Sequence, residues 1–443
     1  MARPLTARVR ALRKWLAGLP PPGPFHGSFW RSPIRGPWLT AVLSTVLLVG
    51  FVVVPITGLV SYAAYNPGLQ GGWTDLTPDK GILGFYLFPW PTRPVWLYWL
   101  NQSVHVILGL VLIPVLLAKL WSVLPKLFEW PVTRSVVHAA ERVSLLLLVA
   151  SSIFEIVTGV INIQYLYAFP GSFYRLHLYG GWVFIAAFAA HVGIKIPALV
   201  RALRSRSLRR ELRKGVGATD PEPREAGELV SPNPAPATIS RRGALGLVGA
   251  GSLTMLAVTL GQTLGGLSRV TAVLAPRGRL LGHGPNDFQV NKTAEFKGIT
   301  PAMVGREWQL ELRGAVTRQL SYEDLLAMPQ HDANLPIACV EGWSTGVQHW
   351  SGVRLRDLAG LVDAANAFSV LVESLEDRAF SSAALRGNQI RDPLSLLALR
   401  VNGATISLDH GYPARVIVPA APGVHNTKWV TRMSFRPQEL DRP

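Results

Sequence analysis

The 443-residue chain has one cysteine, Cys339, and little charge, because Asp, Glu, Lys and Arg make up 16% of it. Ordinary soluble proteins carry roughly 25%. A lone cysteine excludes an internal disulfide, so Cys339 serves either as a small buried apolar residue or through its thiolate. The shortage of charge, with a hydrophobic fraction of 49%, argues against a wholly soluble protein. It predicts a membrane protein with a soluble part attached.

Acidic residues are also scarce, with 27 against 44 basic ones, which gives a net charge of +17. Basic residues gather in segments 1–37 and 201–214, each next to a long apolar stretch. This placement follows the positive-inside rule for cytoplasmic flanks. Because no base-reading motif accompanies the charge, we do not expect nucleic-acid binding.

Five apolar stretches are each long enough to cross a bilayer, which takes about 20 residues. They are residues 38–62, 96–120, 136–163, 174–200 and 243–267. The basic loop 119–134 belongs inside, whereas segment 66–94 has few charges, turn 164–173 has none, and both belong outside. The sequence therefore predicts a cytoplasmic basic N-terminus (1–37), an α-helical transmembrane four-helix bundle (38–205) and a fifth anchor helix (243–267).

Residues 206–242 are predicted to form a cytoplasmic linker, because positions 215–238 are rich in Pro, Glu and Ala without periodicity. Ser240, Arg241 and Arg242 directly precede the fifth stretch. They are either a basic flank that fixes orientation or a twin-arginine export signal. Both readings place the region after residue 266 outside the cytoplasm, in a multi-pass protein of the plasma (inner) membrane.

Four histidines lie in or at the edges of spans two to four: His105, His138, His177 and His191. His177 and His191 are 14 residues apart, which is close to four helical turns, so they share a face roughly 21 Å apart. The alternating topology predicts two cross-helix pairs, His105 with His177 outside and His138 with His191 inside. Alternatively, such histidines pack between helices and bind no metal.

Paired imidazoles facing each other in a helix bundle are the expected axial ligands of b-type haem. Residues 35–205 resemble the di-haem cytochrome b domains of the b561 and formate-dehydrogenase gamma-subunit type, although the first span has no histidine. The resemblance implies two haem b groups that exchange electrons with the quinone/quinol pool. One haem, or purely structural histidines, are the alternatives.

From about residue 275 the chain has the character of a soluble domain, in which short β-type runs alternate with Gly/Pro turns. We expect one α+β, mostly β, domain over residues 275–443. The predicted strands are residues 308–312, 370–373, 405–408 and 415–419, and the predicted helices are 322–328 and 393–401.

Blocks 286–291, 337–355, 409–419 and 423–430 of this domain resemble, in that order, the sulfite-oxidase-type molybdopterin domain. That family binds molybdenum through a pterin dithiolene and one protein thiolate, and soft sulfur donors suit such a metal. The resemblance implies that Cys339 is the metal ligand. It also implies cofactor contacts from Asn286, Ser374, His410, Arg415, Asn426 and Lys428. Without this resemblance, His410 and Arg415 would be interpreted as a pair that stabilises a surface turn.

The segment after the cysteine departs from the family pattern. Sulfite oxidases proper continue with Ala-Gly-Asn-Arg-Arg, which favours an anionic substrate, whereas residues 340–344 here are Val-Glu-Gly-Trp-Ser. This puts a dianion such as sulfite in doubt. The local sequence is more similar to the bacterial branch that includes periplasmic sulfoxide reductases, whose partner is a separate haem membrane subunit.

The sequence thus predicts a membrane-bound molybdenum oxidoreductase that couples oxygen-atom transfer to electron transfer through b-type haems and the quinone pool. The expected substrate is a small molecule such as a sulfoxide, an N-oxide or a related oxyanion. One alternative is a sulfite-type dehydrogenase that passes electrons to quinone. Others are a non-catalytic electron-transfer cytochrome, and an exported enzyme whose haem-free spans are only an anchor.

Overall fold

The computed structural model forms two compact units. The first comprises residues 1–53, 108–158 and 177–256, and the second comprises residues 54–107, 159–176 and 257–443. The structure describes residues 20–65, 88, 90–132, 135–164, 166, 173–224, 229–264, 268–274, 282–376 and 381–437. The predicted N-terminal arm lies partly outside the described residues, and the predicted outer segments 66–94 and 164–173 lie mostly outside them.

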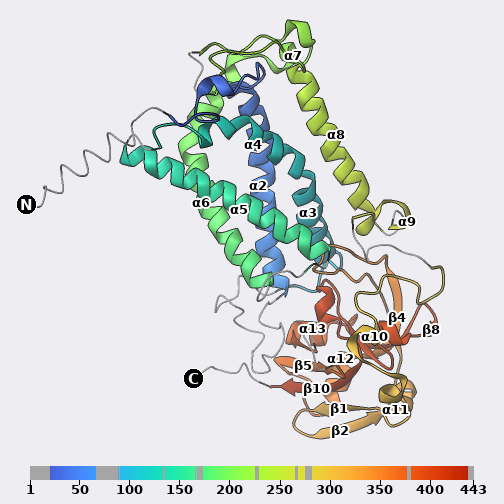
Figure 1. The fold of residues 1–443 in the computed structure, drawn as a ribbon. Coiled ribbons are helices and arrows are strands. Elements are labelled where there is room, and N and C mark those ends of the chain that lie inside the picture. The colour runs from blue at the N-terminus through green and yellow to red at the C-terminus, as the bar shows by residue number, and fades with distance from the viewer. Residues whose placement is uncertain are drawn as a thin grey trace, which may run out of the picture. The chain divides into compact units, whose positions relative to one another are not determined.

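Among the described residues, five helical segments are long and apolar enough to cross a membrane, as the sequence predicts. Figure 1 draws them in blue to yellow-green. They are α2 (Pro37–Tyr65), α3 (Leu97–Val111) with α4 (Ile113–Leu127), α5 (Val136–Ile163), α6 (Phe173–Ser205) and α8 (Arg241–Thr259). All five predicted spans overlap these segments. The fifth, residues 243–267, extends past the end of α8 at Thr259, and residues 265–267 lie outside the described residues.

The second span is divided at Leu112, which separates α3 from α4. Pro114 is the second residue of α4. Proline has no N–H to donate to the preceding turn, and its ring crowds that turn, so a helix is interrupted just before it. The Ser252 hydroxyl of α8 donates a 2.9 Å hydrogen bond to the Val111 carbonyl at this break.

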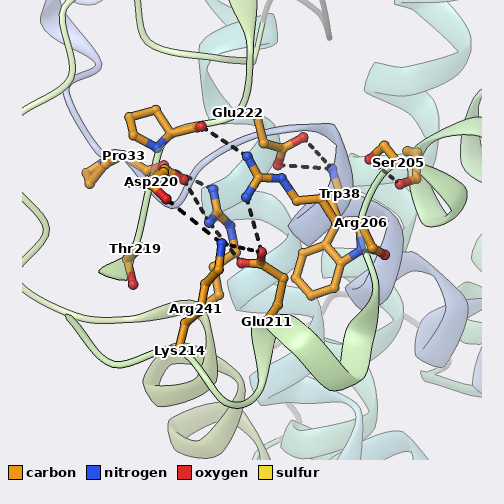
Figure 2. A network of polar contacts seen from close by, with 12 residues as sticks. Pro33, Trp38, Ser205, Arg206, Glu211, Lys214, Thr219, Asp220, Glu222 and Arg241 are labelled. Atoms are coloured by element: carbon orange, nitrogen blue, oxygen red, sulfur yellow. Dashed lines mark hydrogen bonds and ion pairs between the residues drawn. The ribbon is translucent and has the colours of Figure 1, made fainter. Parts of the chain in front are cut away.

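Charged residues just outside the helices of the first unit form a buried network around Glu211 (Figure 2). Its carboxylate is 3.2 Å from Arg206, 3.0 Å from Lys214 and 3.2 Å from Arg241. Arg241 is only 1% exposed and also donates to the carbonyls of Asp220 and Pro33. Burial raises the pKa of Glu211, but the Lys214 hydrogen bond and the two arginines hold that pKa below its ordinary value.

A second carboxylate of the same region caps a helix. Glu222 accepts hydrogen bonds of 3.1 and 3.2 Å from the Trp38 backbone N–H, at the first turn of α2. An acidic group at a helix N-terminus satisfies free N–H groups and the helix dipole. The sequence predicts a cytoplasmic linker over residues 206–242. Within it, Glu211 and Glu222 are both buried, and Glu222 bonds a residue far away in the chain.

The second unit contains two sheets within its described residues, drawn in orange to red in Figure 1. One has the order β2-β1-β10-β5-β6 and the other β3-β4-β7-β8, with β9 paired to β7. Only β1 and β10 pair in parallel. The strands are β1 (Gln309–Arg313), β2 (Thr317–Ser321), β3 (His331–Leu335), β4 (Gln348–Arg354), β5 (Ser369–Ser374), β6 (Ser382–Arg386), β7 (Leu396–Val401), β8 (Ala404–Thr405), β9 (Arg415–Ile417) and β10 (Val430–Arg436).

Short helices connect these strands and complete an α+β, mostly β, domain. They are α10 (Ala294–Lys297), α11 (Tyr322–Ala327), α12 (Leu355–Gly360), α13 (Gly387–Arg391) and the 3₁₀ turns η8 (Leu408–His410) and η9 (Gly423–His425). The predicted strands 308–312, 370–373 and 415–419 lie on β1, β5 and β9. The predicted helix 322–328 lies on α11. Of predicted strand 405–408, only Thr405 is in β8.

The predicted helix 393–401 is wrong, because this segment contains strand β7. Leu397 and Leu399 pack into the core shared with β1, β5 and β10. Leu396 and Ala398 pack on the opposite side, against Phe288. A strand buried on both faces shows a continuous apolar run in place of alternation, and such a run cannot be told from a buried helix by periodicity.

Candidate active site

Cys339 lies in a tight turn between β3 and β4. Its N–H donates to the Trp343 carbonyl at 2.8 Å, and the Gly342 N–H donates back to the Cys339 carbonyl at 3.1 Å. Gly342 has φ +88°, a left-handed conformation that favours glycine. The Gly423 N–H donates to the Ala338 carbonyl, which joins this turn to η9. The turn thus holds the cysteine in place from both sides.

The thiol of Cys339 has polar neighbours although the residue is only 3% exposed. Its Sγ donates to Glu341 Oε2 at 3.3 Å, and Asn291 Nδ2 lies 3.9 Å from the sulfur. The Trp343 indole N–H donates to the same carboxylate oxygen at 3.2 Å. Two residues that depart from the sulfite-oxidase pattern, Glu341 and Trp343, therefore contact each other next to the sulfur.

Arg415 is the centre of a cluster of buried basic side chains. It is 4% exposed, and its two terminal nitrogens each donate a 3.0 Å hydrogen bond, one to the His410 carbonyl and one to the Asn426 carbonyl. Lys428 Nζ donates to the Lys292 carbonyl at 2.6 Å and the Asp409 carbonyl at 2.8 Å. The hydrogen-bond donors of Arg415 and Lys428 therefore bond mostly to backbone carbonyls and not to carboxylates.

Burial changes the acid–base behaviour of the cluster. It lowers the pKa of Arg415 to about 9. Burial, then the charge of Arg415, lowers the pKa of Lys428 to about 7. Burial, then Arg415 and Lys428, lowers the pKa of His410 to about 3. The His410 ring, which stacks on Phe288 with centroids 3.7 Å apart, is therefore neutral at pH 7, and the cluster favours a bound anion.

Two buried polar atoms of this region have no hydrogen-bond partner among the described residues, Arg415 Nε and Thr427 Oγ1. A pterin that ends in a phosphate is a suitable partner for buried Arg, Lys and hydroxyl donors. The residues present therefore fit the implied cofactor: a thiol for the metal and unsatisfied donors with positive charge for the anionic end.

The three remaining predicted cofactor residues hold backbone segments in this structure. Asn286 accepts from the Ser407 N–H at 2.8 Å, and its own carbonyl lies 2.9 Å from His410 Nε2. Asn426 Oδ1 accepts from the Val418 N–H at 2.8 Å, and Ser374 Oγ donates to the Lys428 carbonyl at 2.8 Å. The fold connects these residues to Arg415 and Lys428 through hydrogen bonds, and their cofactor contacts stay predictions.

The four histidines of the membrane helices differ in their polar partners. His105 Nδ1 lies 3.0 Å from the Val54 carbonyl and 3.2 Å from Thr57 Oγ1. His177 Nδ1 lies 2.8 Å from Thr158 Oγ1 and 3.2 Å from Glu155 Oε2. An imidazole fixed in this way through one nitrogen is the usual arrangement of a metal-bound histidine.

His138 and His191 are half-buried in α5 and α6. The pairing of His105 with His177 and of His138 with His191 stays a prediction, as does the binding of haem at all four. Sequence reasoning missed Glu155 beside His177. Its signal was a lone acid inside an apolar span, which is costly and points to function.

Sequence reasoning also missed Gln102, which contacts the cysteine turn within the second unit. Its Nε2 donates to the Val340 carbonyl at 2.8 Å. Trp90 makes a separate contact in the same unit, because its indole N–H donates to the Ala420 carbonyl at 2.7 Å. A buried amide inside an apolar span was the signal for Gln102, but the sequence did not identify its partner.

Residues 297–443 match the family described as "Oxidoreductase molybdopterin binding domain". Relatives include the Bacillus subtilis protein "Uncharacterized oxidoreductase YuiH", 29% identical over 29% of this chain and 65% of that protein. Human mitochondrial sulfite oxidase is 30% identical over 28% of each chain. Nitrate reductase [NADH] 1 of Arabidopsis thaliana is 27% identical over 38% of this chain and 22% of that protein.

The C-terminal part of the chain, residues 297–443, is therefore similar to molybdopterin-binding oxidoreductase domains, including those of sulfite oxidase and nitrate reductase. The chain spans less than two thirds of the length of each of these relatives. The match covers the two sheets and the Cys339 turn and does not reach the long apolar helices.

Proposed function

We propose that this protein is a membrane-bound molybdenum oxidoreductase that reduces a small oxygen-bearing substrate, a sulfoxide or an N-oxide, with electrons from the quinol pool. The observation that carries the proposal is the Cys339 turn, in which the single thiol of the chain is buried, polar and fixed. The nearby cluster of Arg415, Lys428 and His410 supports an anionic pterin as the partner of that thiol.

In this proposal each residue has a defined task. The Cys339 thiolate holds the metal, and Arg415 and Lys428 bind the phosphate end of the pterin. When bound, the cofactor supplies two-electron oxygen-atom exchange. Glu341 keeps the Trp343 indole in place and puts a carboxylate near the metal ligand. A carboxylate at that position disfavours a dianion, so the proposed substrates carry no net charge.

The apolar helices supply the second half of the proposal. Five segments of membrane-spanning length support a plasma-membrane protein in contact with the lipid bilayer, with its N-terminus in the cytoplasm and its catalytic domain outside. The anchored imidazoles of His105 and His177 support b-type haems. The haems would carry electrons one at a time from quinol to the molybdenum centre.

Replacement of the metal ligand tests the proposal. Cys339→Ser in the full-length protein should abolish sulfoxide or N-oxide reduction with a quinol donor and leave the reducible b-type absorption bands unchanged. Ser344→Ala is the matched control, because Ser344 is a buried residue of the same turn and its replacement keeps the thiol. Retained turnover in Cys339→Ser would refute the assignment of Cys339 to molybdenum.

Metal and haem analysis of the purified protein separates the alternatives. Iron without molybdenum would favour a non-catalytic electron-transfer cytochrome. Molybdenum without b-type bands would favour an enzyme for which the helices are only an anchor. Oxidation of sulfite with quinone as acceptor, and no reduction of sulfoxides or N-oxides, would favour the sulfite-type dehydrogenase.

A further inference from the structure

The Cys339 turn packs directly on residues of α2 and α3 inside the second unit. Cys339, Val340 and Trp343 belong to one apolar cluster with Tyr98 of α3 and Ala64 of α2. Each of these five residues is less than a tenth exposed. The predicted metal-ligand turn therefore rests on a side of the two helices that faces protein and not lipid.

Gln102 of α3 makes the polar contact at this surface. Its amide nitrogen donates to the Val340 carbonyl at 2.8 Å, and its amide oxygen accepts from the Ser61 hydroxyl of α2 at 2.9 Å. Gln102 is 6% exposed. Both ends of the amide are bonded in a buried environment, so its orientation is fixed and it holds the backbone next to Cys339.

Gly342 permits a close approach at the next turn of the helix. A Cβ added at Gly342 would lie 2.7 Å from a methyl carbon of Val106, which is far inside van der Waals contact. Tyr98, Gln102 and Val106 are four residues apart in sequence, so they share one face of α3. The whole turn from Cys339 to Trp343 is thus seated along that face.

His105 lies on the same helix, three residues after Gln102. That separation is roughly 4.5 Å along the axis. α2 fixes both residues, because the Ser61 hydroxyl bonds Gln102 and the Val54 carbonyl bonds the His105 ring. One rigid pair of helices therefore positions the backbone next to the predicted molybdenum ligand and the side chain of a predicted haem ligand.

We infer that Gln102 is a positioning residue for electron transfer between the two cofactors. By holding Val340 on α3, it fixes the spacing between the molybdenum ligand Cys339 and the haem ligand His105. This inference rests on the proposed function. The overall reaction is balanced: oxidation of a quinol to quinone releases two electrons and two protons, and a sulfoxide consumes them to give a sulfide and water.

Gln102→Met in the full-length, cofactor-loaded protein tests this role, because methionine has a similar length and no donor. In stopped-flow measurements, the protein is first reduced and then mixed with sulfoxide, and the reoxidation of haem is followed at its absorption band. We expect this rate to fall about tenfold, the lower end of the loss for an outer-layer hydrogen bond, because the spacing between Cys339 and His105 is no longer fixed. Turnover with a soluble donor that reduces the molybdenum centre directly should be retained.

Ser61→Ala is the second variant, since it removes the hydroxyl that orients Gln102 and should slow the same step less. Ser103→Ala is the matched control, because Ser103 is buried on the same helix and its hydroxyl donates to the Trp99 carbonyl of that helix. Unchanged haem reoxidation in Gln102→Met, or in Ser61→Ala if the first variant loses its cofactors, would overturn the inference. A wild-type protein without haem would instead refute the proposed function and the inference with it.

Discussion

Arg415 offers a sharp test of the site, because the structure buries its charge without an ion pair. No carboxylate of the described residues lies within ion-pair distance of it, and burial lowers its pKa from the ordinary arginine value to about 9. A change of that size corresponds to about 5 kcal/mol against the charged form. Two carbonyl hydrogen bonds, worth about 1.5–3 kcal/mol each, offset most of that cost.

Arg415→Met removes the charge cost and the two hydrogen bonds together. In the cofactor-free protein these changes nearly cancel, so we expect the free energy of unfolding to stay within about 2 kcal/mol of wild type. In the cofactor-loaded protein the charge has an anionic partner. There the variant should lose about tenfold to a hundredfold in cofactor retention, because each charge-assisted bond contributes about 1.5–3 kcal/mol.

The assay compares full-length protein from cells that make the molybdenum cofactor with protein from cells that do not. Unfolding is followed by tryptophan fluorescence in detergent, and retained pterin is measured by its fluorescence after gel filtration. Arg354→Met is the matched control, since Arg354 Nε is also buried without a hydrogen-bond partner among the described residues but lies outside the cluster. An Arg415 variant equally destabilised in both preparations would refute the reasoning.

The same variant has a pH signature through His410, whose pKa is lowered to about 3 by burial and then by Arg415 and Lys428. Above pH 6.5 the histidine is neutral in both states and its effect on stability is absent. As pH falls below 6.5, the unfolded chain takes up a proton that the folded domain does not take up until about pH 3. The free energy of unfolding therefore falls by about 5 kcal/mol over this range. Without the Arg415 charge, this loss of stability in acid should be smaller. An unchanged fall in the free energy of unfolding below pH 6.5 would contradict the coupling between Arg415 and His410.

Two further predictions concern the membrane part. Arg241→Gln should lower the free energy of unfolding by about 3 kcal/mol, because it removes one of the cations around the buried Glu211 carboxylate. Arg242→Gln is the control: this residue is exposed, so thermal unfolding should be unchanged. Protection of the catalytic domain from protease added to spheroplasts of both variants would instead show that its export had failed, and would indicate the twin-arginine route. Glu155→Gln should keep haem and raise its midpoint potential, because a carboxylate beside His177 makes the imidazole a stronger donor; an unchanged redox titration would contradict this.

The long apolar helices could be predicted from sequence because the signal for each is contained within its own residues. Twenty apolar residues in a row predict a span whatever the rest of the chain does. The burial of Glu211 and Glu222 within the predicted linker could not be predicted, for the opposite reason. Glu222 is ordered by the backbone N–H of Trp38, 184 positions earlier, and Glu211 by Arg241, 30 positions later. Composition alone contains no information on such partners.

In the candidate site, too, features encoded in short segments could be predicted, whereas long-range contacts could not. The Cys339 segment and the Arg415 and Lys428 region could be identified because their motifs are short and ordered along the chain. β7 was missed because two apolar cores bury both of its faces. Gln102 was missed because its partner, Val340, is 238 positions away, and a lone amide in an apolar span predicts only that some polar partner exists.

The contacts of the Cys339 turn also give a physical reason for its unusual sequence. Gly342 is required by its positive φ and by the approach of Val106. Trp343 packs in the cluster with Tyr98 and bonds Glu341. The glycine and the tryptophan thus fit the seating of the turn on α3, and their departure from the sulfite-oxidase pattern carries no information on the substrate. Glu341 is different, because its carboxylate bonds the thiol itself. The argument against a dianionic substrate therefore rests on Glu341, and Glu341→Gln is the substitution that isolates it.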